Sequence, residues 1–231
     1  MSLAHNLRDV LRRIEDAAKA AGRDPAEVRL VAVSKTKPAQ AVQEALTAGQ
    51  TIFGENYIQE SQTKIPQVGP HIGTSPVWHF IGHLQSNKAR LAVRLFDVVQ
   101  TVDRVKIAGA LSRHAAEQGK TLGVLLQVNV GQEPQKAGCS EADAPALAQA
   151  VAELPGLKLM GLMTMPPFFD DPERARPYFA RLRELARRMA PDLPAGTMNE
   201  LSMGMSGDFE AAIAEGATLV RVGTAIFGSR Y

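Results

Sequence analysis

A lysine stands directly after an apolar run near the start of the chain. Lys35 follows the apolar residues 30–33 and Ser34, and it precedes Thr36-Lys37-Pro38. An amine at the end of a buried strand can be partly desolvated, which lowers its pKa and leaves some of it uncharged. The uncharged amine attacks aldehydes to form a Schiff base, so Lys35 is a candidate for covalent binding of a carbonyl compound. The alternative is an ordinary exposed lysine after a strand.

Two segments rich in small and hydroxyl residues could bind an anion. They are residues 202–207, Ser-Met-Gly-Met-Ser-Gly, and residues 221–224, Arg-Val-Gly-Thr. Glycine lets backbone N–H groups approach an anion, and Ser206 starts a predicted helix whose N-terminus favours phosphate. An amine beside a phosphate site suits a phosphorylated aldehyde such as pyridoxal phosphate. Plainer interpretations stay open: Ser206 as a helix cap, Gly223 for close packing, and Arg221 paired with a carboxylate.

Two more polar residues follow predicted strands. Asn56 comes after Phe53-Gly54-Glu55, and His83 comes after an apolar run and Gly82. Asn56 could instead cap the helix that follows it. His79 lies four residues before His83. On or after a strand, this spacing does not give the geometry of a helical metal site, so we expect no metal.

Short apolar runs alternate with amphipathic segments along the whole chain. A helix opens the chain and ends before Gly22. The predicted strands are residues 29–34, 51–53, 77–81, 96–101, 121–130, 157–163, 199–201 and 218–222. The helices between them are residues 38–48, 56–64, 86–93, 103–118, 142–153, 172–189 and 207–215.

Strands that alternate with helices imply parallel pairing and right-handed crossovers. About eight such units fit the α/β class, as a single (β/α)8 TIM barrel with an extra N-terminal helix, in one domain over residues 1–231. In that fold the residues after the strands meet at one end of the barrel. An open doubly wound sheet is the second possibility, but no dinucleotide fingerprint follows the first strand.

Composition excludes several classes of protein. The 231 residues carry 26 basic and 24 acidic side chains, and no basic block is interleaved with aromatics, so we expect no nucleic-acid partner. Cys139 is the only cysteine, which excludes an internal disulfide and a cysteine metal cluster. No signal peptide and no apolar stretch long enough for a membrane are visible, so a cytoplasmic protein is expected.

Five segments, in order, resemble one family over essentially the whole chain. They are residues 31–38 (Val-Ala-Val-Ser-Lys-Thr-Lys-Pro), 53–57 (Phe-Gly-Glu-Asn-Tyr), 78–88 (Trp-His-Phe-Ile-Gly-His-Leu-Gln-Ser-Asn-Lys), 201–206 (Leu-Ser-Met-Gly-Met-Ser) and 221–228 (Arg-Val-Gly-Thr-Ala-Ile-Phe-Gly). The family is the pyridoxal phosphate homeostasis proteins, whose barrel is similar to the N-terminal domain of alanine racemase.

The resemblance implies a role for each candidate residue. It implies that Lys35 carries pyridoxal 5′-phosphate (PLP) as an internal aldimine and that Arg221 faces the pyridine nitrogen. Lys37 is a secondary candidate for a contact or a transfer site. The remaining residues divide into a phosphate group and a ring group. The resemblance places Ser206, Gly223, Thr224 and the backbone near Met205 at the phosphate, and Asn56 and His83 near the ring.

Two classes of function remain open at this stage. The first is a PLP carrier that stores, buffers or delivers the cofactor, with PLP-dependent apo-enzymes as possible recipients. The second is a PLP-dependent amino-acid racemase with His83 as its second base. A permanent cation at the pyridine nitrogen weakens the electron sink, and no residues follow Tyr231 to form a second catalytic domain. Both points favour the carrier, which we expect to be a monomer. A Schiff-base aldolase is a third, remoter option.

Overall fold

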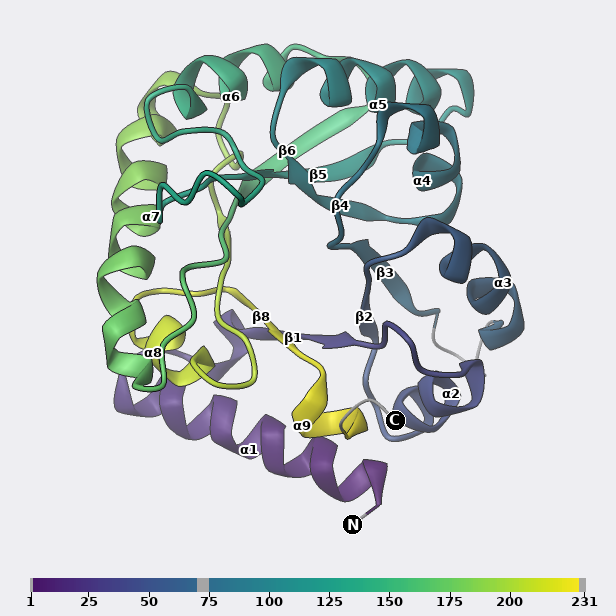
Figure 1. Cartoon of the computed structure of the whole chain (residues 1–231), viewed down its shortest axis with the longest axis vertical. Helices are drawn as coiled ribbons and strands as arrows, with labels where there is room; N and C mark the ends of the chain where they lie inside the picture. Colours follow the sequence, from purple (N-terminus) through teal and green to yellow (C-terminus); the bar gives the residue numbers. More distant parts are fainter. Residues whose placement is uncertain (1, 70–74, 229–231) are drawn as a thin grey trace.

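The computed structural model describes residues 2–69 and 75–228, so the chain's last residue, Tyr231, lies outside the described part. Eight parallel strands pair in chain order and close into a barrel (Figure 1). This confirms the predicted (β/α)8 barrel and excludes the open sheet. The strands are Arg29–Val33 (β1), Ile52–Glu55 (β2), Val77–Phe80 (β3), Val98–Val102 (β4), Leu122–Gln127 (β5), Leu157–Met163 (β6), Glu200–Ser202 (β7) and Leu219–Val222 (β8).

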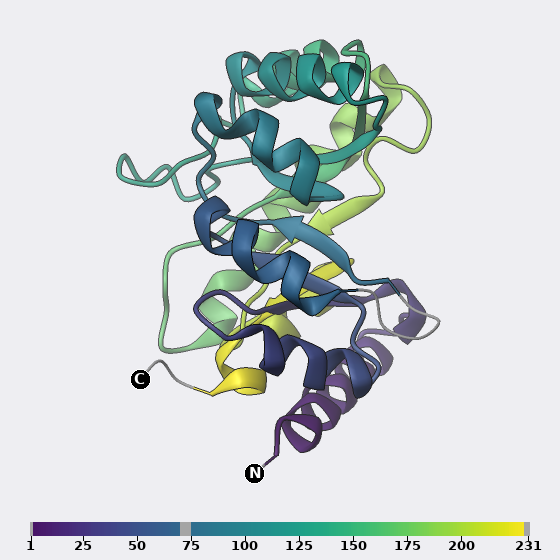
Figure 2. The same cartoon turned by 90° about the vertical axis from the view of Figure 1, so that its right-hand side faces the viewer.

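A helix follows every strand and covers the outside of the barrel (Figure 2). These helices are Ala39–Thr47 (α2), Ile58–Val68 (α3), Ala89–Leu95 (α4), Val105–Glu117 (α5), Ala144–Ala152 (α6), Arg176–Met189 (α7), Phe209–Ala214 (α8) and Thr224–Phe227 (α9). The sequence did not predict α9, which is a single turn after β8. None of the helices among the described residues has the length and apolar composition needed to cross a membrane.

The extra N-terminal helix, Leu3–Ala20 (α1), is confirmed. Its buried residues, Leu7, Val10, Ile14 and Ala18, recur at helical spacing and form one apolar face. The helix ends before Gly22, whose φ of 68° suits glycine. Figure 1 shows α1 beside α8 and α9, and it packs against both. Because α9 has only four residues, α1 covers the part of the barrel that a full eighth helix would cover.

The predicted end of one strand and the predicted bounds of one helix are wrong. The apolar run 121–130 was predicted as one strand, but β5 ends at Gln127. Val128 and Val130 stay buried because the following loop folds back, with a backbone bridge between Val128 and Cys139. The helix predicted over residues 56–64 begins at Ile58 and continues to Val68, with Pro66 in its last turn.

Side chains fill the barrel in layers, because alternate residues of a strand point to the same face. One layer of the interior is apolar and buried, and it contains Val31, Val98, Leu125, Met163 and Leu219. Two residues further along the strands, a polar layer follows with Gln100 after Val98 and Arg221 after Leu219. Both polar side chains are buried. On β4 and β8, these polar side chains lie between the apolar layer and the C-terminal ends of the strands.

Candidate functional site

A cavity of about 670 Å³ opens at the C-terminal ends of the strands, and its volume is in the range of small-molecule sites. Nearly all of the predicted site residues line it, although they come from both halves of the sequence. These are Lys35, Asn56, Met205, Ser206, Arg221, Gly223 and Thr224. The structure therefore brings the lysine, the guanidinium and the hydroxyl residues to one wall.

His83 is the exception among the predicted residues. It is exposed and does not belong to the residues that line the cavity. Its neighbour in the motif, His79, is buried in β3. Among residues 2–69 and 75–228, no group of His, Cys, Asp or Glu side chains is arranged to hold a metal ion.

Lys35 lies in a sharp turn at the end of β1. Lys35 is half-buried, and Thr36 after it has a φ of 65°, in the left-handed region that β-branched residues avoid. Such a conformation persists only where the surrounding structure holds it. The turn that carries Lys35 is therefore a defined part of the cavity wall.

Arg221 is the buried cation of the site, with 4% of its surface exposed. Its Nη1 donates to Ser202 Oγ at 2.7 Å and its Nη2 to the carbonyl of Thr164 at 2.9 Å. These neutral partners contrast with the carboxylate pairing that the sequence left open. Burial lowers the pKa of Arg221 to about 10, against the opposing effect of Asp208. Arg221 consequently stays charged at neutral pH.

A chain of hydrogen bonds crosses the barrel from Arg221 to His79. Ser202 Oγ donates to Gln100 Oε1 at 2.6 Å, and Gln100 Nε2 lies 2.7 Å from His79 Nδ1. Because Gln100 Oε1 already accepts, its amide nitrogen donates and His79 Nδ1 carries no proton. Burial, with a smaller effect of the charge on Arg29, lowers the pKa of His79 to about 3. His79 is thus a neutral acceptor that helps to fix Arg221.

The low pKa of His79 predicts a loss of stability in acid. Between pH 6.5 and 3 the unfolded chain binds a proton at this histidine that the folded protein does not, so the free energy of unfolding falls as pH falls. From pH 7 to pH 5, we expect this histidine to cost about 2 kcal/mol. Urea unfolding of wild type and His79→Asn at both pH values measures it, because asparagine keeps an acceptor and does not titrate.

The comparison with His79→Asn is needed because Glu55 acts in the opposite direction. Burial raises the pKa of Glu55, so the folded protein holds its proton at higher pH than the unfolded chain does. The difference between wild type and variant cancels this contribution. An equal acid-induced loss in both proteins would show that folding does not lower the pKa of His79.

Residues 202–207 after β7, one of the two segments that could bind an anion, differ from the prediction in where the next helix begins. Helix α8 begins at Phe209 with Asp208 as its N-cap residue, so Ser206 lies in the preceding turn and is not the cap. The Met205 N–H donates to Asp208 Oδ1 at 2.6 Å, and Asp208 also lines the cavity. Burial raises the pKa of Asp208. An anion that used the Met205 N–H would have to replace this carboxylate.

Gly223 has a structural reason to be glycine. A Cβ there would lie 3.1 Å from the carbonyl oxygen of Val33, which is a tight contact with the backbone of β1. Close packing, one of the interpretations left open by the sequence, therefore applies at this position. Thr224 follows at the start of α9, where its side chain is exposed along the cavity.

Sequence reasoning missed the part of the wall that follows β5 and β6. These lining residues are Gln135, Lys136, Ala137, Met165, Pro166, Pro167, Phe168 and Phe169. Lys136 Nζ donates to the carbonyl of Pro166 at 2.8 Å, which joins the two loops. The sequence contains one sign of this part of the wall, the apolar run of residues 165–169 shortly after β6. In the structure, Phe168 of this run is 86% exposed. Large apolar side chains in such a position indicate a binding surface.

The donor set of the cavity fits a phosphorylated aldehyde. It offers an amine, a buried cation and two hydroxyl side chains. Asn56 Oδ1 is buried and has no hydrogen-bond partner among the described residues. An unpaired buried amide oxygen is costly, so a donor from a ligand would stabilise it.

Fold and cavity together define a (β/α)8-barrel protein with a lysine and a cation at the carboxyl ends of its strands. The family model described as alanine racemase, N-terminal domain, matches residues 2–231. The pyridoxal phosphate homeostasis protein of Pseudomonas aeruginosa is 51% identical, over 99% of this chain and 96% of that protein. This chain belongs to the alanine racemase N-terminal domain family and, within it, to the pyridoxal phosphate homeostasis proteins.

Solved structures agree with this assignment. PipY of Synechococcus elongatus PCC7942, described with PLP bound, has a TM-score of 0.84 and 38% identity, and the match covers 98% of this chain and 100% of PipY. A histidine racemase from Leuconostoc mesenteroides has a TM-score of 0.70 at 24% identity. This chain covers 57% of that racemase, a likeness that concerns the fold alone.

Proposed function

We propose that this protein holds pyridoxal 5′-phosphate on Lys35 and acts in PLP homeostasis, by storing, buffering or delivering the cofactor. One observation carries the proposal: the cavity wall combines Lys35 with Arg221, Ser206 and Thr224. The family of this chain and the name of its relative from P. aeruginosa support the same cofactor. The effect on amino-acid and keto-acid metabolism would be indirect.

Each residue of the wall has a chemical role in this proposal. Lys35 would hold the cofactor covalently by condensing with its aldehyde carbon, with a C=N bond in place of the C=O bond and one water released. The hydroxyls of Ser206 and Thr224 would donate hydrogen bonds to the phosphate, and Asn56 Oδ1 would accept one from the ligand. When bound, the cofactor supplies an electron-accepting ring. Arg221 would hold the ring side of the cofactor, where its charge would oppose protonation of the ring nitrogen and so limit the ring as an electron sink.

A racemase is the alternative, and the geometry supports it less well. Racemisation needs a second base opposite Lys35, and the residue predicted for that role was His83. His83 is exposed and lies outside the cavity wall. The racemases among the structural relatives share the fold only at low sequence identity. We therefore assign no reaction to this site.

Proton exchange separates a carrier from an enzyme. PLP-loaded protein would be incubated with each amino acid in deuterated water, and loss of the α-proton would be followed by NMR. A carrier should exchange no amino acid faster than free PLP does. Turnover of about 1 s⁻¹ or more with any amino acid, in the range of ordinary enzymes, would overturn the carrier proposal.

Ser206→Ala should weaken retention of the cofactor. A lost hydrogen bond to a charged phosphate costs about 1.5–3 kcal/mol, so the Kd should rise by roughly tenfold or more. Equilibrium dialysis with PLP measures the change. Ser140→Ala is the control, because Ser140 donates to Asp143 in the loop before α6 and does not line the cavity. An unchanged Kd for Ser206→Ala would show that this hydroxyl does not bind the phosphate.

The partners follow from the carrier proposal. We expect PLP-dependent apo-enzymes to receive the cofactor and the protein to be a monomer. Light scattering of the loaded and unloaded protein tests the second expectation.

A further inference from the structure

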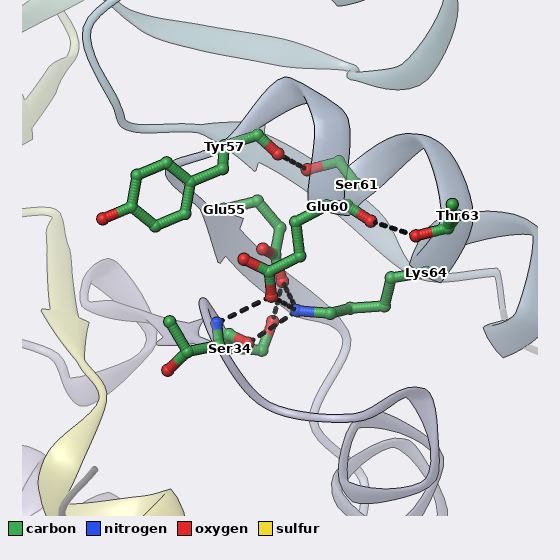
Figure 3. A network of polar contacts seen from close by, with 8 residues as sticks. Ser34, Glu55, Tyr57, Glu60, Ser61, Thr63 and Lys64 are labelled. Atoms are coloured by element: carbon green, nitrogen blue, oxygen red, sulfur yellow. Dashed lines mark hydrogen bonds and ion pairs between the residues drawn. The ribbon is translucent and has the colours of Figure 1, made fainter.

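A buried charged cluster lies directly behind the turn that carries Lys35. We call it the Lys64 cluster, and it consists of Glu55 at the end of β2 with Glu60 and Lys64 on α3 (Figure 3). Glu55 is fully buried and Lys64 is 5% exposed. Charged groups are seldom buried unless they are paired, and none of these three residues lines the cavity.

Lys64 uses its three N–H donors on three acceptors. Its Nζ donates to the carbonyl of Ser34 and to Glu55 Oε1, each at 2.8 Å, and also to Glu60 Oε1. An ammonium group has three donors and no acceptor, so this arrangement satisfies it. Lys64 therefore ties the last carbonyl before Lys35 to two carboxylates on other elements.

The same carboxylates hold both neighbours of Lys35. Ser34 Oγ donates to Glu55 Oε1 at 2.7 Å, and the Thr36 N–H donates to Glu60 Oε1 at 2.6 Å. Thr36 has the unfavourable φ of 65°, and its N–H bond to Glu60 favours that conformation. The backbone on each side of Lys35 is thus fixed by the Lys64 cluster.

We propose that Lys64 and Glu60 are positioning residues that orient the turn of residues 34–36 so that the Lys35 amine meets an aldehyde in the cavity. This inference rests on the proposed function. The bond that it concerns is the condensation of the Lys35 nitrogen with the aldehyde carbon, which releases one water. Attachment depends on the approach of the amine, whereas phosphate binding depends on Ser206 and Thr224, which follow β7 and β8.

The competing explanation is that the cluster only packs α3 against β1 and β2. The two explanations differ in what a variant would lose. A packing role predicts lower stability, with covalent attachment and reversible binding changed alike. A positioning role predicts slower attachment while reversible binding of the phosphate and ring is kept. Pyridoxine 5′-phosphate, which has an alcohol in place of the aldehyde, measures reversible binding alone.

The first test compares Lys64→Met with wild type. The rate of attachment of PLP, followed by visible absorbance and by borohydride fixation, should fall about tenfold or more, as for a misplaced reacting group. The Kd for pyridoxine 5′-phosphate should stay within about twofold. Lys120→Met is the matched control, because Lys120 Nζ donates to the carbonyls of Val93 and Phe96 before β4, at the other end of the barrel. It should attach PLP at the wild-type rate.

Substitutions of Glu60 decide the question if Lys64→Met does not fold. Glu60 is partly exposed, with 25% of its side-chain surface accessible. Glu60→Ala removes the acceptor of the Thr36 N–H and should slow attachment, while Glu60→Gln keeps an acceptor oxygen and should restore most of the rate. Equal rates in Glu60→Ala and wild type would overturn the positioning role.

The outcomes separate the two levels of the proposal. If wild-type protein attaches no PLP, the proposed function fails and this inference fails with it. If wild type attaches PLP and Lys64→Met attaches it at the same rate, only the positioning role fails. A parallel loss of PLP attachment and pyridoxine 5′-phosphate binding would also reject positioning in favour of packing.

Discussion

Lys35→Ala protein should carry no cofactor that borohydride can fix, whereas wild type should carry one per chain on Lys35. The reason is that reduction traps only a C=N bond, and alanine has no amine to form it. Reversible binding should persist, because Ser206, Thr224 and Arg221 remain. Intact-mass measurement after borohydride treatment, with peptide mapping to locate the label, gives the result directly.

Lys37→Ala is the matched control, since it removes the same charge two residues further along the chain. It should be labelled at Lys35 as wild type is. Lys136 is the other lysine on the cavity wall, and it is engaged with the carbonyl of Pro166. A label found on Lys136 in wild-type protein would contradict the assignment of Lys35.

Gly82→Ala should destabilise the protein by about 3 kcal/mol or more, in the upper range for single substitutions. A Cβ at Gly82 would lie 2.1 Å from the carbonyl oxygen of Asn56. Because this obstacle is backbone, the ends of β2 and β3 would have to move apart. Asn56 lines the cavity, so binding of pyridoxine 5′-phosphate should weaken as well. Urea unfolding and equilibrium dialysis measure the two effects.

Gly109→Ala is the control for the extra methyl group. Gly109 lies within α5, and a Cβ there would meet nothing within 4 Å. Alanine favours a helix over glycine by about 0.5–1 kcal/mol, so this variant should be slightly more stable than wild type. Gly82→Ala with wild-type stability would mean that β2 and β3 approach less closely than described.

The fold could be predicted from the sequence because the two patterns that indicate it, apolar runs and amphipathic segments, are local. Apolar runs such as residues 30–33 predict covered parallel strands, and the amphipathic segments between them predict the helices. The error in β5 has a physical cause, since Val128 and Val130 are buried by a loop that folds back rather than by continued strand pairing. Apolar character reports burial and does not distinguish these two ways of achieving it.

Residues of the site could be predicted from the sequence where a chemically distinctive residue stands at the end of a strand. Lys35, Asn56 and Arg221 meet at the cavity because the ends of parallel strands meet at one end of a barrel. The same rule failed for His83, since it gives the end of the barrel and not the direction of a side chain beyond the strand. For Arg221, a carboxylate partner was considered, but Ser202 and the carbonyl of Thr164 hold it.

The Lys64 cluster could not be predicted from the sequence in this way. Its contacts join β1, β2 and α3, and no local pattern predicts a bond from Lys64 to the carbonyl of Ser34. One part of it has a local signature, because Glu60 and Lys64 are four residues apart on a helix and can pair. A glutamate in a buried strand, such as Glu55, was a further sign that a partner must exist.

The filled interior of the barrel determines the route of any bound molecule. Arg221 of the polar layer lines the cavity, and Gln100 and the apolar layer with Val31 and Leu219 are also buried in the barrel. Within the part of the chain that the structure describes, these buried side chains fill the interior of the barrel. For the carrier that we propose, loading and unloading would both use the mouth of the cavity at the carboxyl ends of the strands, so they would not occur at the same time.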